Sequence, residues 1–246
     1  MTLHIVYPEG KFFKEIIDCL SKMIDEVAFQ VYPDKLLVRA MDPGRVSLIE
    51  IEIPSSLFLE YVVDKESNIN LSVANLSRIL KGIKKGSRFV IEQEGEDVIV
   101  KIEALGKRVY KFRNLDIPLP EIPELTYEFD VRGQLMADTI KHAIKDAESV
   151  GDQLEIAAPD DKTIVFKGKG TTLVENKLTM GSPSLIYLEV RKPSKSTYQL
   201  EFLRNILGLT RVADVVTIEF SNDSPLKLAF KISEGEVRFL LAPAIT

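Results

Sequence analysis

The chain has 246 residues, of which 45% are apolar and 28% are charged, with 37 acidic side chains against 32 basic ones. These values are typical of a globular protein with one large domain or two ordinary ones, and a net charge of −5 excludes a generally basic coat for nucleic acid. A single cysteine excludes an internal disulfide and a cysteine-based metal cluster, and two histidines leave little material for a histidine-rich metal site.

The first ten residues, MTLHIVYPEG, lack the basic start and the long apolar run of a secretory signal. The longest apolar stretches, such as residues 239–245, are too short to cross a bilayer. We therefore expect a cytoplasmic protein without membrane contact. His4 falls in an alternating strand pattern and is expected to be structural, and the apolar neighbours of Cys19 indicate a buried thiol.

Helical spacing of apolar residues predicts four helices, at residues 11–27, 71–84, 133–150 and 199–212. Between them, a period of two predicts strands at residues 36–39, 48–53, 89–92, 98–103, 109–113, 163–167, 187–190, 217–220 and 237–241. Each half of the chain therefore has the order helix, several strands, helix, several strands. Gly10 aligns with Gly133 and Arg78 with Arg204, which indicates an internal duplication.

The connection between the two halves carries Pro118, Pro120 and Pro123. Proline at this density forbids a helix and stiffens an extended segment. The sequence thus predicts an N-terminal domain at residues 1–116, a linker at 117–128 and a C-terminal domain at 129–246.

The second predicted helix is purely basic, although the chain as a whole is acidic. No Asp or Glu occurs from Ser67 to Ile91, and the charged residues within ANLSRILKGIKKG are Arg78, Lys81, Lys84 and Lys85. The other helices add Lys14, Lys141, Lys145, Arg204 and Arg211, while Asp18 weakens the first helix. Each set alone could be an ordinary solvated face, but four basic helices favour a common positive surface for phosphates.

Two other stretches could carry chemistry. KGKGTT at residues 167–172 lacks the spacing of a phosphate-binding loop and falls between strands, so a hairpin turn is expected. The acids Glu92, Glu94, Glu96 and Asp97 fall in a strand and its turn with no histidine near them, which favours a solvated edge over a metal site. Nothing completes an active site, so we expect no enzyme, no metal and no cofactor.

Six short stretches carry a family resemblance: MDPGRVSLIEIEIP at 41–54, NLSRILKG at 75–82, NLDI at 114–117, IPEL at 122–125, SPLKLAFKI at 224–232 and FLLAP at 239–243. In this order they resemble the sliding clamps of replication, the proliferating cell nuclear antigen family, over essentially the whole chain. The resemblance is to the archaeal type, because the chain ends at Thr246 without the tail usual in eukaryotic members.

The resemblance implies an α+β clamp fold, with two duplicated domains per subunit and three subunits in a ring. Helices would line an inner channel around double-stranded DNA, and antiparallel sheets would lie outside. The basic residues would contact phosphates without reading bases; they are Lys14, Arg78, Lys81, Lys84, Lys141, Lys145, Arg204 and Arg211. Glu15 stands where the family usually has a second lysine beside Lys14, so a weaker lining is expected.

The resemblance also implies a processivity factor that acts through a clamp loader, DNA polymerase, flap endonuclease and DNA ligase. These partners carry short peptides, for which the matching pocket positions are Met41, Arg45, Val46, Leu48, Leu119, Ile122, Pro123, Pro225, Leu240, Ala242 and Pro243. Leu240 replaces a common aromatic residue, so an aliphatic pocket is expected. The alternative for Leu48 and Leu119 is a place in the core between the domains.

The strand at residues 107–115 is expected to end the first domain, with Val109 and Phe112 opposed to Arg108 and Tyr110. An edge strand is a liability unless another chain pairs with it. The resemblance implies a partner strand at residues 171–179, with Leu173, Glu175 and Lys177. Head-to-tail pairing would then close a ring of identical or different subunits.

Two alternative functions remain. One is an interaction scaffold without a DNA channel, in which the basic helices are accidental. The other is a metal-dependent enzyme that modifies nucleic acid through Glu92, Glu94 and Asp97.

Overall fold

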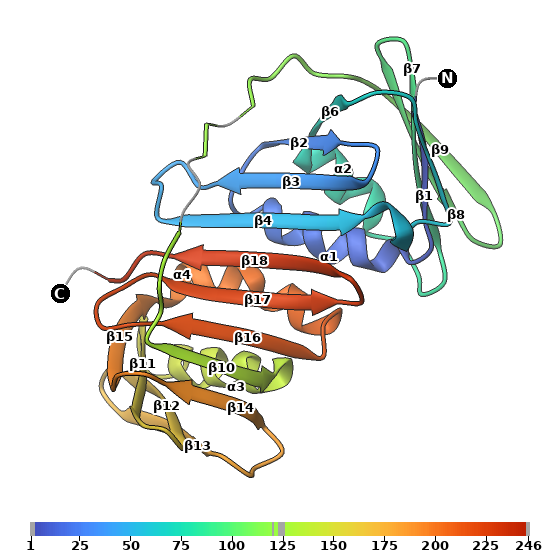
Figure 1. Ribbon diagram of the computed structural model, residues 1–246. Helices are drawn as coiled ribbons and strands as arrows, with labels where there is room; N and C mark the ends of the chain where they lie inside the picture. The colour runs from blue at the N-terminus through green and yellow to red at the C-terminus, as the bar shows by residue number, and fades with distance from the viewer. Residues whose placement is uncertain (1–2, 120, 123–125, 245–246) are drawn as a thin grey trace. The chain divides into compact units, whose positions relative to one another are not determined.

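The computed structural model describes residues 3–119, 121–122 and 126–244 and contains two compact units (Figure 1). The first unit comprises Met1–Pro43, Ile49–Ile122 and Ile232–Glu236, and the second comprises Gly44–Leu48, Pro123–Lys231 and Val237–Thr246. No helix in the described ranges is long and apolar enough to span a membrane.

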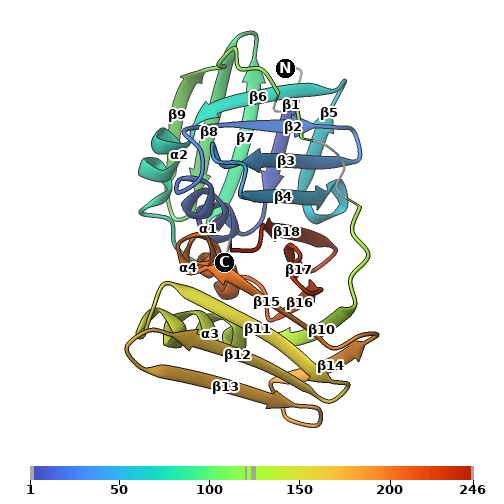
Figure 2. The same cartoon turned by 90° about the vertical axis from the view of Figure 1, so that its left-hand side faces the viewer.

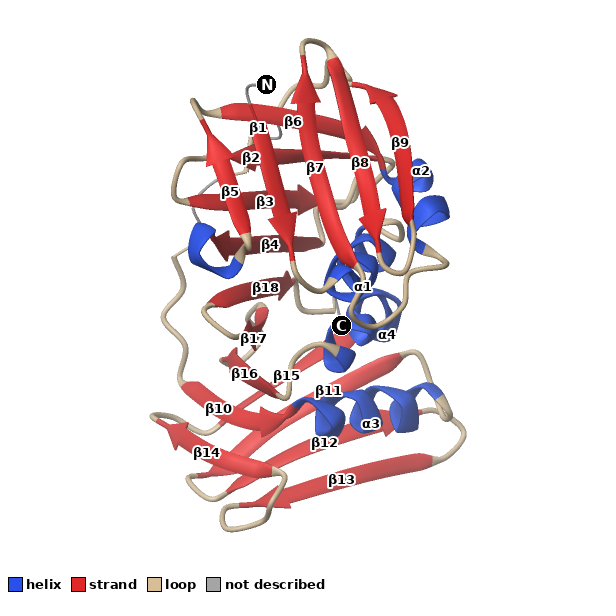
Figure 3. Ribbon diagram, turned by 90° about the vertical axis from the view of Figure 1, so that its right-hand side faces the viewer, coloured by secondary structure: helices blue, strands red, loops and turns tan. Residues whose placement is uncertain are grey.

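The first unit combines antiparallel strands with two short helices. Its elements are β1 (Leu3–Tyr7), α1 (Gly10–Leu20), β2 (Glu26–Val31), β3 (Lys35–Met41), β4 (Ser47–Pro54), the 3₁₀ turn η1 (Ser55–Leu57), β5 (Glu60–Val63), β6 (Ser67–Ser72), α2 (Val73–Leu80), β7 (Arg88–Glu94), β8 (Asp97–Glu103) and β9 (Lys107–Arg113). Five strands lie side by side in the order β5–β1–β7–β8–β9 (Figure 3), and four more follow the order β4–β3–β2–β6.

The second unit repeats this plan. Its elements are β10 (Val131–Met136), α3 (Ala137–Glu148), β11 (Gln153–Asp160), β12 (Thr163–Lys169), β13 (Leu173–Thr179), β14 (Leu185–Val190), β15 (Ser194–Gln199), α4 (Leu200–Leu203), the 3₁₀ segment η2 (Arg204–Arg211), β16 (Val215–Phe220), β17 (Leu226–Ile232) and β18 (Gly235–Leu241). The strand orders are β14–β10–β16–β17–β18 and β13–β12–β11–β15.

The matching strand orders confirm the predicted duplication but correct its alignment. Gly10 begins α1, whereas Gly133 lies inside β10, so the two glycines are not equivalent. The residue of the second unit that corresponds to Gly10 is Ala137, at the start of α3. The difference arises because β10 runs directly into α3, so the apolar residues of β10 were included in the predicted helix.

The predicted helices were too long. The first ends at Leu20, and Val27 lies in β2; Leu71 lies in β6, and Leu135 and Met136 lie in β10. The reason is that β6, β10 and β15 run directly into α2, α3 and α4, so apolar strand residues extend the helical spacing. The fourth predicted helix is one short α-helical turn followed by 3₁₀ geometry.

The helices cover the sheets with their apolar faces. In the first unit, α1 packs against α2, and the rings of Phe13 and Phe89 stack with centroids 4.4 Å apart. Cys19 is fully buried on α1, as predicted. In the second unit α3 lies across β11 and β12 (Figure 2).

Candidate functional site

The helices of the first unit present basic side chains to solvent. Arg78, Lys81 and Lys84 are exposed on α2 and the turn that follows it, and Lys14 is half-buried on α1. Leu76 and Leu80 point inward and are completely buried, so packing of the apolar stripe turns the charged side outward. The guanidinium of Arg78 donates a hydrogen bond to Asn75 Oδ1 at 3.1 Å.

The helical segments of the second unit also present basic side chains to solvent. Lys145, Arg204 and Arg211 are exposed and Lys141 is half-buried, while Ile140, Ile144 and Leu203 are buried. The predicted DNA-contacting residues therefore all lie on the helical segments or the turn after α2. None of these side chains is buried in the core.

Carboxylates lie close to several of these cations. Of these acids, only Asp18 was expected from the sequence to weaken the basic surface. Lys14 Nζ lies 2.7 Å from Asp18 Oδ2, Lys141 Nζ 2.8 Å from Asp138 Oδ1, and Arg204 Nε 3.2 Å from Glu148 Oε1. The hydrogen bond and the charge of Lys141 hold the pKa of Asp138 below its usual value. Glu15, which stands where a second lysine was expected, is a buried residue of α1, and its Oε1 lies 3.6 Å from Lys14 Nζ.

The predicted interface strands lie at the ends of their strand orders. Within the described residues β9 pairs only with β8, and β13 only with β12. Val109 on β9 is 55% exposed and Leu173 on β13 is 62% exposed. Both strands thus offer one unpaired edge with an exposed apolar side chain.

One detail of the predicted β9 pattern was wrong. Phe112 shares a face with Tyr110 and Arg108 rather than with Val109, because side chains two apart lie on the same side of a strand. On β13, Leu173, Glu175 and Lys177 share the exposed face, and Glu175 Oε2 lies 3.2 Å from Lys167 Nζ.

The predicted peptide-pocket residues fall in both units. The first unit holds Met41, Leu119 and Ile122, of which Leu119 is exposed and Ile122 is buried; Pro123 lies outside the described residues, as does Pro120 of the predicted linker. The second unit holds Arg45, Val46, Leu48, Pro225, Leu240, Ala242 and Pro243.

Within the second unit the pocket residues form a partly exposed apolar set. The amide of Ala242 donates a hydrogen bond to the carbonyl of Val46 at 2.9 Å, and Leu240 and Pro243 are half-buried. Leu48 is buried. Arg45 has a φ of 55°, a left-handed conformation that non-glycine residues adopt rarely.

The acidic strand end at residues 92–97 is solvated at Glu94 and Glu96, as expected, but not at Glu92. Glu92 is buried, and a histidine does approach it: His4 Nδ1 lies 3.0 Å from Glu92 Oε1, and His4 Nε2 lies 3.1 Å from Glu60 Oε2. Lys101 also donates to Glu92. Burial raises the pKa of Glu92, but the hydrogen bonds and charges of Lys101 and His4 outweigh it and bring the pKa below its ordinary value of 4.5.

This network is a hydrogen-bonded row of side chains across β5, β1, β7 and β8. Among the described residues, no group of three or more His, Cys, Asp or Glu side chains could hold a metal ion. The row therefore offers structural charge pairing rather than a metal-binding arrangement.

The KGKGTT stretch forms the expected hairpin connection between β12 and β13. A Cβ added to Gly170 would lie 1.5 Å from the carbonyl oxygen of Val150, and one added to Gly168 would lie 2.5 Å from Cα of Ala147. The glycines therefore permit close packing against the end of α3 rather than forming a phosphate loop.

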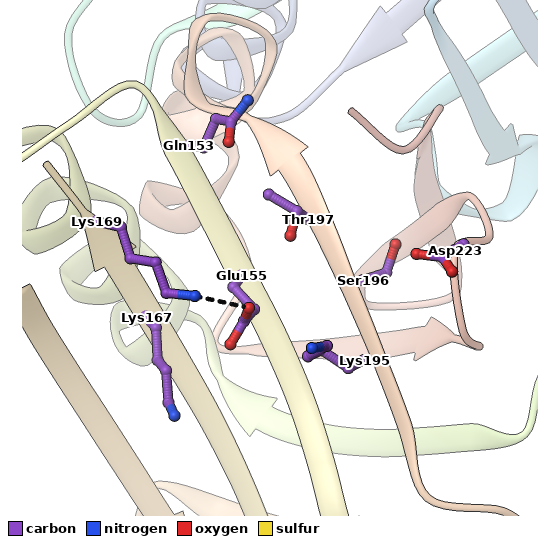
Figure 4. A pocket seen from close by; sticks show the side chains of 8 residues that line it. All are labelled: Gln153, Glu155, Lys167, Lys169, Lys195, Ser196, Thr197 and Asp223. Carbon is purple, nitrogen blue, oxygen red and sulfur yellow. Dashed lines mark hydrogen bonds and ion pairs between the residues drawn. The ribbon is translucent and has the colours of Figure 1, made fainter. Parts of the chain in front are cut away.

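The two lysines of this stretch line a polar groove on the second unit (Figure 4). Its side chains come from β11, β12, β15 and the turn after β16: Gln153, Glu155, Lys167, Lys169, Lys195, Ser196, Thr197 and Asp223. Lys169 Nζ lies 3.1 Å from Glu155 Oε2, and Lys167 is paired with Glu175. Both lysines thus already have carboxylate partners.

Comparisons with known proteins cover the whole chain. Residues 2–120 match the family model "Proliferating cell nuclear antigen, N-terminal domain", and residues 121–245 match the corresponding C-terminal domain. The chain is similar to "DNA polymerase sliding clamp 1" of Aeropyrum pernix, with 36% identity over 242 residues, covering 96% of this chain and 98% of the relative. It is 34% identical to "DNA polymerase sliding clamp" of Pyrococcus furiosus, covering 100% of this chain and 99% of the relative.

Solved structures agree with the sequence matches. The proliferating cell nuclear antigen of Thermococcus kodakaraensis superposes with a TM-score of 0.92 at 31% identity, covering 99% of this chain and 100% of the other. A chain of the PCNA2–PCNA3 complex of Sulfolobus tokodaii gives 0.91 at 25% identity, covering 98% of each chain. The chain therefore has the clamp fold and belongs to the proliferating cell nuclear antigen family.

Proposed function

We propose that this protein is a DNA polymerase sliding clamp that encircles double-stranded DNA and tethers replication enzymes. The observation that carries the proposal is the exposed basic set on the helical segments of both units, in a fold shared with structures of the family. Phosphate contact of this kind is independent of sequence, as a sliding tether requires. The protein would act without chemistry of its own, in the cytoplasm and on the nucleoid of an archaeal cell.

The proposed subunit has domains at residues 1–116 and 129–246 joined by the linker at 117–128. Three subunits would close a ring through β9 of one chain and β13 of the next, because both strands offer a free edge in the described residues. The ring would be opened by a clamp loader, and its other subunits would be copies of this chain or related clamps.

The DNA surface is tested by charge reversal. We expect Arg78→Glu, Lys81→Glu and Arg204→Glu together to abolish stimulation of a polymerase and to reduce retention on nicked circular DNA, with assembly intact. A matched control reverses three exposed lysines outside the helices, Lys65, Lys162 and Lys192, with the same change in net charge. Stimulation that is undiminished at moderate salt in the first variant would rule out a DNA-facing surface.

The tethering function requires a peptide pocket, for which Leu240, Ala242 and Pro243 of the second unit and Ile122 of the first are the proposed anchors. Central anchor positions concentrate binding energy, so truncating one costs about 2 kcal/mol or more. We expect Leu240→Ser and Ile122→Ala each to weaken a motif peptide from the polymerase, flap endonuclease or ligase by about 30-fold. Calorimetry on assembled protein measures this, and wild-type affinity in both variants would refute the pocket.

A further inference from the structure

The basic helices differ in how their cations are bound within the chain. In the first unit, Lys14 of α1 is paired closely with Asp18, at 2.7 Å, and more distantly with buried Glu15, at 3.6 Å. Lys81 and Lys84 after α2 have no ion pair among the described residues. In the second unit, Arg204 is paired with Glu148 across elements, whereas Lys145 of α3 has no ion pair among the described residues. Lys141 of α3 is also paired, with Asp138. Each unit thus combines cations held by a carboxylate with cations that have no ion pair among the described residues.

Helix stability does not explain the two carboxylates. Asp18 lies in the last turn of α1, and Glu148 is the last residue of α3. A negative charge at a helix C-terminus is opposed by the helix dipole. In addition, the order Lys14 then Asp18 is the less favourable orientation for a pair four residues apart.

Asp138, by contrast, lies in the first turn of α3, where the dipole favours an acid. Its position needs no other explanation, although it also pairs with Lys141.

The internal repeat shows that the fold does not require either acid. When the starts of α1 and α3 are aligned, Lys14 corresponds to Lys141 and Asp18 corresponds to Lys145. The residue that corresponds to Glu148 in the first unit is Ser21. The same helix therefore exists in this chain without the carboxylate at either place.

The two ion pairs are exposed enough to exchange. The side chains of Lys14 and Asp18 are 24% and 36% exposed, and those of Arg204 and Glu148 are 56% and 26% exposed. Pairs of this kind contribute little net stability in water. A DNA phosphate that binds the ammonium of Lys14 or the guanidinium of Arg204 must first displace the carboxylate. The phosphate then remains close to the negative charge of that carboxylate.

We propose that Asp18 and Glu148 compete with DNA phosphates for Lys14 and Arg204. By holding these two cations, the carboxylates keep the affinity of the clamp for DNA low enough for sliding. This inference rests on the proposed function. It divides the DNA surface into cations that are always available, such as Lys81, Lys84 and Lys145, and cations that are available only when a carboxylate releases them.

The test uses the assembled clamp with Asp18→Asn, Glu148→Gln and the double variant. Binding to a dye-labelled duplex is followed by fluorescence anisotropy across a range of KCl concentrations. We expect affinity to rise by about 1.5- to 5-fold for each carboxylate removed. The slope of log K against log salt should steepen by up to about 0.9 for each additional phosphate that the clamp neutralises. Clamps loaded on stretched DNA should diffuse more slowly.

The control is Glu189→Gln on β14, which removes an equal charge from the exposed pair with Arg191 outside the helices. Thermal melting checks folding, and removal of Asp18 should leave the melting temperature unchanged or raise it. Affinity and diffusion of each single variant equal to those of Glu189→Gln would overturn the inference. Failure of the proposed function is distinct: the charge-reversed variant at Arg78, Lys81 and Arg204 would then bind the duplex as well as the unmodified clamp.

Discussion

At the scale of single residues, Glu92 is a buried carboxylate that stays charged because it is bonded to Lys101 and His4. Replacement by Gln leaves Lys101 without its counter-charge beside a buried position, which typically costs about 3 kcal/mol. We expect Glu92→Gln to lower the free energy of unfolding by about this amount at pH 7, measured by urea denaturation.

The loss of stability caused by Glu92→Gln should depend on pH in a defined direction. The pKa of Glu92 is lower in the folded state than in the unfolded one, so its contribution is present above about pH 4.5 and is lost as the pH falls through the folded value. The difference between wild type and variant should therefore shrink below pH 4.5. Glu60→Gln is the control, because Glu60 binds the same histidine but is 61% exposed; an equal loss in both variants would show that burial is not the cause.

The sequence predicted the strand that holds Glu92 but not the environment of the side chain. His4 is 88 residues away in the chain and meets Glu92 only because β1 pairs with β7. Alternation alone assigns a charged residue to the solvated face. A buried charge is recognisable only when the partner strand and its register are known.

At the scale of elements, α3 approaches β12 so closely that Gly168 has no room for a side chain. A Cβ would lie 2.5 Å from Cα of Ala147, within the helix backbone, so the helix or the strand would have to move. Overpacking of this kind costs about 1–3 kcal/mol. We expect Gly168→Ala to lower the stability of the second unit by this amount in thermal or chemical unfolding.

Gly106, in the turn between β8 and β9, is the matched control, because a Cβ there would meet nothing within 4 Å. Gly106→Ala should change stability by no more than about 0.5 kcal/mol. If both substitutions behave alike, the close approach of α3 to β12 is not what selects glycine.

Sequence patterns also predicted the structure best at the scale of helices and strands. The sequence pattern predicted that the basic residues of α2 face solvent. They do so because Leu76 and Leu80 are buried on the opposite side of the helix. The boundaries failed where a strand passes into a helix without a turn, as at Ser72–Val73 and Met136–Ala137. Glycine or proline usually marks such a change, and neither occurs at these junctions.

At the scale of the whole molecule, the proposed assembly depends on β9 and β13. We expect Val109→Glu together with Tyr110→Glu to yield monomers, because charges on the edge of β9 would have to be desolvated when a partner strand pairs there. Sedimentation equilibrium measures the mass. A variant that keeps the mass of the full assembly would show that another edge makes the interface.

The family could be predicted from the sequence because short stretches such as FLLAP and NLSRILKG occur in the right order. The pairing of Arg204 with Glu148 could not, because the two residues are far apart in the chain and belong to different helical segments. Order along the chain identifies a family, whereas the balance of charges on its surface depends on contacts in space.

The single cysteine gives this protein a built-in reporter of opening. Cys19 is buried on α1 in the first unit, and the second unit contains no cysteine at all. A thiol reagent can react only when α1 detaches from its surroundings, so the rate of labelling measures how often the first unit opens locally. An added surface cysteine in the second unit would react at once, and a dye could be placed there without touching the native thiol.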